Sequence, residues 1–212
     1  MQFSSGEIVI ATTNKGKVRE FAHRFAVFGT EVRSLNDYPD VPPIVEDGLT
    51  FVDNALIKAQ TVARLLGRTA IADDSGLCVD ALSGEPGVYS ARYAGEHASD
   101  EDNIKKLLDR LTAAEGSSEF SGELLEDGAR LLSAARFVCA LALVHHDSEE
   151  TVIVEMSCEG FIIDRPRGEN GFGYDPVFYV PRYGRTMAQL SLAEKQSISH
   201  RGKALDALFN RF

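Results

Sequence analysis

The chain has 212 residues, which is enough for one large domain or two small lobes around a substantial core. Its formal net charge of −10 argues against a protein that follows a nucleic-acid backbone, because such a protein needs a basic face. A small polyanion remains a feasible ligand, since it requires only a local cluster of cations. No apolar run reaches the roughly 18 residues of a membrane span, and residues 1–7 lack the regions typical of a signal peptide. The 3 cysteines lie far apart in apolar contexts, which favours a reducing cytoplasm over a disulfide framework or a zinc site. We therefore expect a cytoplasmic protein with neither a nucleic-acid nor a membrane partner.

Apolar periodicity and turn residues predict strands that alternate with helices in the first half of the chain. The predicted strands are 7–12, 31–35, 70–72, 136–145 and 151–158. The predicted helices are 18–28, 50–66, 99–111 and 199–211. The last two strands are expected to form an antiparallel pair joined near 146–149, and the polar segment 112–132 is expected to be a surface insertion or mobile loop. These elements predict a mixed α/β fold, in which residues 1–212 form a single elongated domain of two lobes with a central groove.

The run Ala70 to Gly76 carries two adjacent carboxylates directly after a buried strand. The carboxyl ends of buried strands often carry chemistry, because the sheet fixes the backbone while the side chains reach a cleft. Successive strand residues point to opposite faces, so Asp73 and Asp74 are expected to have different tasks. We interpret Asp73 to Gly76 as a turn that contains glycine, and an ordinary polar turn would show the same residues.

A second candidate is the strand-to-helix connection that follows the first predicted strand. Small residues there let backbone N–H groups converge, the helix N-terminus adds positive potential, and a lysine supplies a full charge. This arrangement suits phosphate, although an ordinary turn with solvated lysines remains the alternative. The residues concerned are Thr12, Thr13, Asn14, Lys15, Gly16 and Lys17.

Two further segments favour a flat, charged ligand. Gly171 to Pro176 places two aromatic rings between glycines, where a heterocycle could stack, or where the rings could simply cover the core. Cations near the start of the last predicted helix oppose the helix dipole, which mildly indicates function over a solvated basic face. Those cations are Lys195, His200, Arg201 and Lys203.

Six motifs, taken in order, resemble those of the inosine/xanthosine triphosphate pyrophosphatases, which hydrolyse noncanonical purine nucleotides. The motifs are Thr12-x-Asn14-x-x-Lys17, Glu46 to Lys58, Ala72 to Leu77, Pro86 to Tyr93, Gly171 to Pro176, and Glu194-Lys195 with Ser199 to Gly202. The resemblance covers nearly the whole chain. The main departure is the segment 113–134, which is longer than in typical members and lies outside the motifs.

The resemblance implies an ITPase-like or Maf-like fold and the cleavage of ITP, dITP, XTP or dXTP to the monophosphate and pyrophosphate. It implies that Asp74 prepares the attacking water and binds Mg²⁺ together with Glu46, which agrees with the preference of Mg²⁺ for a few carboxylates, water and phosphate oxygens. Lys58 would neutralise phosphate together with Asn14 and Lys17, with Arg92 a weaker candidate. Ser75 would donate a hydrogen bond near the sugar or phosphate. The nucleobase would meet Phe172, Gly173, Tyr174, Asp175, Lys195, His200 and Arg201.

The resemblance also implies a homodimer whose other partner is a small-molecule nucleotide. Two alternatives stay open at the level of sequence. One is a Maf-type pyrophosphatase acting on other modified nucleotides, and the other is a nucleotide-binding module without catalysis. The acidic set of Glu46, Asp73 and Asp74 argues against the second, because a binder of a polyanion gains nothing from carboxylates unless a metal is held.

Overall fold

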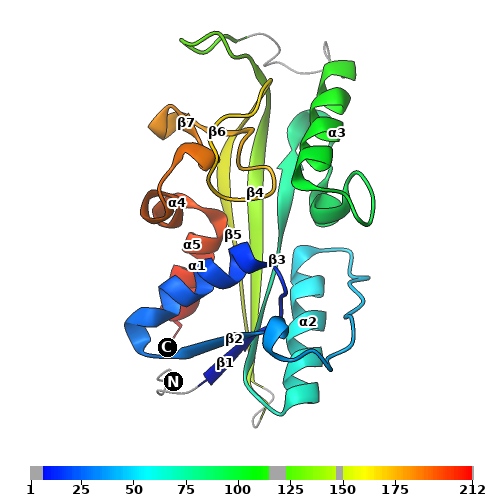
Figure 1. Ribbon diagram of the computed structural model, residues 1–212, viewed down its shortest axis with the longest axis vertical. Coiled ribbons are helices and arrows are strands. Elements are labelled where there is room, and N and C mark those ends of the chain that lie inside the picture. The colour runs from blue at the N-terminus through cyan, green and yellow to red at the C-terminus, as the bar shows by residue number, and fades with distance from the viewer. Residues whose placement is uncertain (1–6, 115–122, 147–149, 212) are drawn as a thin grey trace. The chain divides into compact units, whose positions relative to one another are not determined.

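The computed structural model describes residues 7–114, 123–146 and 150–211 (Figure 1). Within these ranges the strands form one seven-stranded sheet in the order β2-β1-β3-β4-β5-β6-β7. The strands are β1 (Glu7–Ile10), β2 (Glu31–Ser34), β3 (Ala70–Val79), β4 (Leu131–Val144), β5 (Thr151–Ile163), β6 (Phe178–Val180) and β7 (Arg185–Thr186). The α-helices are α1 (Lys15–Phe25), α2 (Phe51–Leu66), α3 (Asp100–Ala113), α4 (Leu192–Ile198) and α5 (His200–Phe209). Short 3₁₀ helices lie at Ala26–Phe28, Leu35–Asp37, Asp80–Leu82, Gly87–Arg92, Pro181–Tyr183 and Met187–Gln189.

The sheet combines parallel and antiparallel pairs, which confirms the mixed α/β prediction. Strand β1 is parallel to both β2 and β3, whereas β5 pairs antiparallel with β6 and β6 with β7. Strands β4 and β5 are neighbours joined by a connection of a few residues. Parallel neighbours need a crossover of a dozen or more residues, so these two strands form the predicted antiparallel pair.

The chain divides into two compact units, as the prediction of two lobes requires. The first unit comprises Met1–Asp74, Cys139–Met156 and Arg201–Phe212, and the second comprises Ser75–Val138 and Ser157–His200. The groove, the elongated shape and the single domain over 1–212 stay predictions.

The core of the first unit is formed where helices α1 and α5 pack against the sheet. Phe21 and Phe25 of α1 and Leu205 of α5 are buried in one cluster with Ile71 of β3 and Leu141 of β4. Figure 1 shows α2 on the other side of these strands from α1 and α5. Side chains of α2 spaced three or four residues apart are buried, as expected for an amphipathic helix that covers a sheet.

The second unit has its own core. Ile104 and Leu107 of α3 are buried in one cluster with Leu77 of β3, Phe137 of β4 and Phe178 of β6. Helix α3 begins at a capping box, in which the Ser99 side chain accepts from the backbone N–H of Asp102.

Several predicted boundaries are wrong. The turn predicted at Asp73 to Gly76 does not form, because β3 continues through it to Val79. A strand can carry both carboxylates when each finds a cationic partner, and the site below supplies them. The helix predicted over 18–28 ends at Phe25 and is followed by a 3₁₀ turn, which leaves Phe28 41% exposed.

The C-terminal region also differs from its prediction. Helix α4 precedes α5, capped by Ser191 and separated from α5 at Ser199, whose backbone is extended. Strand β4 begins at Leu131 and β5 continues to Ile163, so both are longer than predicted. Residues 115–122 of the predicted insertion and residues 147–149 of the predicted connection lie outside the described residues.

No helix in the described part of the chain is both long and apolar enough to span a membrane.

Candidate functional site

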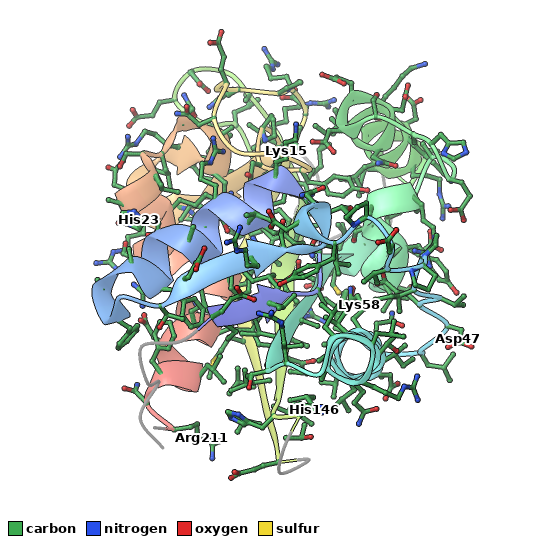
Figure 2. The ribbon with its side chains drawn as sticks, turned by 60° about the horizontal axis from the view of Figure 1, so that its bottom comes forward. Lys15, His23, Asp47, Lys58, His146 and Arg211 are labelled. Carbon is green, nitrogen blue, oxygen red and sulfur yellow. The ribbon has the colours of Figure 1, made fainter. Side chains whose placement is uncertain are left out.

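The loop between β1 and α1 forms the predicted strand, turn and helix. Asn14 caps α1 by accepting a hydrogen bond from the Lys17 backbone N–H at 3.0 Å, and the Thr12 hydroxyl accepts from the Asn14 N–H at 3.2 Å. The first turn of α1 contains no acidic residue. Thr13 and Lys15 are exposed, and Figure 2 shows Lys15 at the beginning of the helix. This loop therefore presents a helix N-terminus and a lysine to solvent, as an anion site requires.

The Lys17 side chain reaches from α1 to the middle of β3. Its ammonium lies 2.6 Å from Asp73 Oδ1 and donates to the Asp73 carbonyl at 3.2 Å. The side chain is 15% exposed. An ammonium has three N–H donors, and these two contacts use two of them. The third N–H of Lys17 can therefore donate to a ligand.

A second lysine lies between two carboxylates. The Lys58 ammonium, on α2, is 2.7 Å from Glu46 Oε2 and 2.7 Å from Asp74 Oδ1 (Figure 2). Lys58 and Asp74 are buried, whereas the Glu46 side chain is 32% exposed. Asn54 lies one helical turn before Lys58 and donates to Asp74 Oδ2 at 3.3 Å. Glu46 and Asp74, which are 28 residues apart in the printed sequence, thus converge on one cation.

The protonation of these groups follows from their surroundings. Burial raises the pKa of Asp74 above its ordinary value, and Lys58 only partly opposes that rise. Burial would also raise the pKa of Glu46, but Lys58 outweighs it, and the pKa of Glu46 lies below its usual value. Burial disfavours the charged form of Lys58, yet Asp74 and Glu46 together raise its pKa. The three groups form a site in which two carboxylates share one positive charge.

Asp73 faces a different set of partners, as the alternation of a strand predicts. Its Oδ2 accepts from Arg201 Nε at 2.6 Å and from the Cys139 thiol at 3.2 Å. Glu20 balances the charge, since its Oε2 accepts from Arg201 Nη1 at 2.6 Å. Burial would raise the pKa of Asp73, but Arg201 and Lys17 hold it well below its usual value. The adjacent carboxylates are therefore placed in opposite electrostatic environments.

The predicted base-binding segment forms a tight loop in the second unit. Asp175 is buried and accepts from the Phe172 backbone N–H at 2.9 Å and from the Lys195 ammonium at 2.7 Å. Lys195 also lies 4.7 Å from the centre of the half-buried Phe172 ring. Gly171 has φ +84°, and a Cβ there would overlap the Asp175 carboxylate. This loop thus requires glycine at 171.

The remaining loop residues anchor it. Tyr174 is buried and its hydroxyl donates to the Ser90 carbonyl at 2.9 Å. Burial raises the pKa of Tyr174. The Gly173 N–H donates to Asp100 Oδ2 at 2.6 Å. A cavity of about 520 Å³ lies beside the loop, lined by Phe172, Gly173 and the α3 residues Asp100 and Ile104, among others.

The structure places the other predicted site residues in these two units. Ser75 is half-buried and follows Asp74 on β3. His200 is buried in the second unit, where its ring stacks on Phe137 with centroids 4.9 Å apart. Arg201 was expected to line the base pocket together with Lys195. Its guanidinium instead contacts Asp73 and Glu20 in the first unit, so its contact with a nucleobase stays a prediction.

The comparisons with known proteins agree with the resemblance seen in the motifs. Residues 8–211 match the model of the Ham1 family. This chain belongs to the Ham1 family. A relative from Geobacillus kaustophilus, named dITP/XTP pyrophosphatase, is 54% identical over 95% of this chain and 92% of its own length. A relative of the same name from Bacillus cereus is 50% identical over 97% and 94%.

Solved Ham1 structures have the same fold. The HAM1 protein from Coxiella burnetii has a TM-score of 0.80 and 42% identity, and the alignment covers 95% of each chain. The Ham1 protein from Staphylococcus aureus has a TM-score of 0.77 and 44% identity, with the same coverage. The fold predicted from the sequence is therefore confirmed.

The acidic pair of this Ham1-family chain fits a magnesium ion. Glu46 and Asp74 already converge on a cation, the Lys58 ammonium, and both offer hard oxygen ligands. Within 7–114, 123–146 and 150–211, no three His, Cys, Asp or Glu side chains are grouped as metal ligands. Mg²⁺ needs only one or two carboxylates when phosphate and water complete its shell, so the pair is sufficient.

Reasoning from the sequence assigned no site role to three residues, Asn54, which contacts Asp74, Glu20, which contacts Arg201, and Cys139, which contacts Asp73. The sequence contains a pattern that could have indicated Asn54 and Glu20. Asn54 and Lys58 are spaced i, i+4 on one helix, and Glu20 is a charged residue beside Phe21 in an apolar stripe. No sequence signal pairs Cys139 with Asp73, because the two residues are brought together only by adjacent strands β3 and β4.

Proposed function

We propose that this chain hydrolyses noncanonical purine nucleoside triphosphates and so removes them from the nucleotide pool. The substrates are ITP, dITP, XTP and dXTP, and the products are the nucleoside monophosphate and pyrophosphate. The observation that carries this proposal is the convergence of Glu46 and Asp74 on Lys58. Membership of the Ham1 family and the names of the relatives favour this activity over a Maf-type enzyme or a binding module.

The triphosphate binds at the β1–α1 loop and the two lysines. The cap residue Asn14 and the neighbouring N–H groups face the negative charge, and Lys17 and Lys58 neutralise it. Thr12, Thr13, Lys15 and Gly16 complete this loop. An anionic ligand offsets the cost of gathering these donors at one helix terminus.

Asp74 acts as the general base, and Asp74 and Glu46 would hold a Mg²⁺ ion. When bound, Mg²⁺ neutralises phosphate charge and makes water easier to deprotonate. Burial raises the pKa of Asp74, which makes its carboxylate a better proton acceptor than an exposed aspartate. Asn54 fixes the orientation of Asp74 through its 3.3 Å hydrogen bond. Lys58 exchanges its carboxylate contacts for phosphate oxygens, and Ser75 donates near the sugar or phosphate.

The nucleobase stacks on Phe172, and the polar residues around it discriminate between bases by hydrogen bonding to the edge of the ring. Asp175 holds both the Phe172 backbone and Lys195, so the loop is preorganised before the base enters. Lys195 and His200 supply donors for an oxygen at C6, where adenine carries an amino group, whereas the base contact expected of Arg201 stays a prediction because its guanidinium contacts Asp73 and Glu20. Adenine would leave such donors unpaired, which supports rejection of ATP by at least about 10²-fold in kcat/KM.

We also propose a cytoplasmic homodimer. The family resemblance and the 3 cysteines, all free thiols, agree with a reducing compartment. Sedimentation of the purified chain across a range of concentrations tests the dimer.

A nucleotide panel with separate assays for pyrophosphate and orthophosphate tests the activity. We expect ITP, dITP and XTP to release pyrophosphate, with ATP poorer by at least about 10²-fold in kcat/KM. Asp74→Asn is the matched inactive control. Release of orthophosphate would contradict cleavage between the α and β phosphates, and similar kcat/KM values for ATP and ITP would contradict the proposed base site.

A further inference from the structure

Asp73, to which the proposed chemistry gives no role, lies at the centre of a buried ion cluster. The cluster joins four elements, with Lys17 and Glu20 on α1, Asp73 on β3, Cys139 on β4 and Arg201 on α5. Arg201, Asp73 and Glu20 side chains are each at most 6% exposed. Two carboxylates face two cations, so the formal charge of the cluster is zero.

The Asp73 carboxylate has a donor on every side. Oδ1 lies 2.6 Å from Lys17 Nζ and accepts from Arg201 Nη2 at 3.3 Å. Oδ2 accepts from Arg201 Nε at 2.6 Å and from the Cys139 thiol at 3.2 Å. A carboxylate has about four acceptor directions, and these four contacts use them. Asp73 is therefore unsuited to bind a metal or to accept a proton from water.

Lys17 is the one member of the cluster with access to solvent. Its side chain is 15% exposed, and both of its described contacts are to Asp73, one to the carboxylate and one to the backbone carbonyl. A free lysine samples many rotamers, and ordering it on binding costs side-chain entropy. Because the Lys17 ammonium is already held by Asp73, most of this loss of entropy does not occur when a ligand binds.

We propose that Asp73, oriented by Arg201 and the Cys139 thiol, is a positioning residue that holds Lys17 ready for a phosphate group. This inference rests on the phosphate-binding role given to Lys17 in the proposed function. Cys139 helps to fix the plane of the Asp73 carboxylate, because its thiol and Arg201 Nε both contact Oδ2. The other oxygen, Oδ1, contacts Lys17 and Arg201 Nη2.

A substitution at Cys139 tests the cluster with the least disturbance of its buried charges. Removing Arg201 or Glu20 would leave a buried charge unpaired and could unfold the protein. Cys139→Ala removes one weak donor and leaves all charges in place, and Cys139→Ser restores a donor. Cys158→Ala is the matched control, because Cys158 is also buried and its thiol lies 3.9 Å from the Glu159 carbonyl.

The experiment measures the binding of inorganic tripolyphosphate with Mg²⁺ by calorimetry, together with KM and kcat for ITP. We expect Cys139→Ala to weaken tripolyphosphate binding about 3–10-fold, since a thiol is a weaker donor than an amide. KM should rise while kcat changes less. Cys139→Ser should restore most of the affinity, and Cys158→Ala should bind like the wild type.

A double-mutant cycle with Lys17→Ala separates positioning from general packing. In the Lys17→Ala background, Cys139→Ala should cause no further loss of affinity. An equal loss in both backgrounds, or wild-type affinity of Cys139→Ala, would overturn the positioning role. Failure of the wild type to release pyrophosphate from any purine triphosphate would instead refute the proposed function, and tripolyphosphate binding would still decide the role of Asp73.

Discussion

Asp73 and Asp74 permit a matched experiment, because the same substitution to asparagine can be made at two adjacent residues on opposite faces of β3. Both side chains are buried, at 1% and 7% relative exposure of the residue. Their partners differ, since Asp74 contacts Lys58 and Asn54 whereas Asp73 contacts Arg201, and their pKa values are shifted in opposite directions. We expect one substitution to remove activity and the other to remove stability.

Asp74→Asn should lower kcat by about 10²–10⁴-fold, the usual contribution of one positioned base. Its effect on stability should be small. The raised pKa of Asp74 means that folding already disfavours its charged form, and Lys58 keeps Glu46 as a partner. In the wild type, kcat/KM should fall with decreasing pH as Asp74 becomes protonated, and the fall should lie above the ordinary value of about 3.9.

Asp73→Asn should destabilise the fold by about 3–5 kcal/mol, the cost of breaking a buried ion pair. At about 2–4 °C per kcal/mol for a chain of this size, Tm should fall by roughly 6–20 °C. Because the pKa of Asp73 is lower in the folded than in the unfolded state, its contribution is complete above the unfolded value of about 3.9. This contribution is lost as pH falls through the pKa of Asp73 in the folded state. The difference in Tm between the wild type and Asp73→Asn should therefore become smaller in strong acid.

Thermal unfolding between neutral and acid pH, with pyrophosphate release at saturating ITP, measures both effects. Retention of more than about a tenth of the wild-type kcat by Asp74→Asn would refute its role as base. An Asp73→Asn protein with unchanged Tm at neutral pH would refute the argument from the buried cluster.

Three further predictions address the ligand. Lys17→Ala should weaken binding of triphosphate far more than that of nucleoside monophosphate, by about 1.5–3 kcal/mol per lost charge-assisted contact and increasingly with salt; equal losses in a binding titration would place Lys17 away from the β and γ phosphates. Phe172→Ala should weaken nucleoside monophosphate binding by about 1–3 kcal/mol without affecting tripolyphosphate, whereas Tyr89→Ala, at an exposed aromatic, should change neither. Chelation with EDTA should abolish pyrophosphate release and added Mg²⁺ should restore it; activity that persists in EDTA would exclude the metal site at Glu46 and Asp74.

Local patterns in the sequence were sufficient for much of the fold. Thr50 and Gly67 mark the ends of α2 because capping and left-handed glycine are decided by neighbouring residues, and the capping box at Ser99 does the same for α3. Helix α4 was missed because it is only 7 residues long and has little periodicity to detect. The continuation of β3 through Asp73 and Asp74 was missed because two charged residues followed by serine and glycine are typical of a turn.

Some features of the candidate site were likewise predictable from the sequence, and others were decided only by the tertiary structure. The sequence by itself determined the residue types, the alternation that separates Asp73 from Asp74, and the order of strand, loop and helix around residues 12–17. It could not assign partners, because a charged side chain is paired by residues distant in the chain. Only the tertiary structure placed Lys58 between Glu46 and Asp74 and joined Arg201 to Asp73 across 128 positions. Burial makes those pairings obligatory, since a carboxylate removed from water must find a cation or hydrogen-bond donors, and the packing of helices on the sheet decides which one is near.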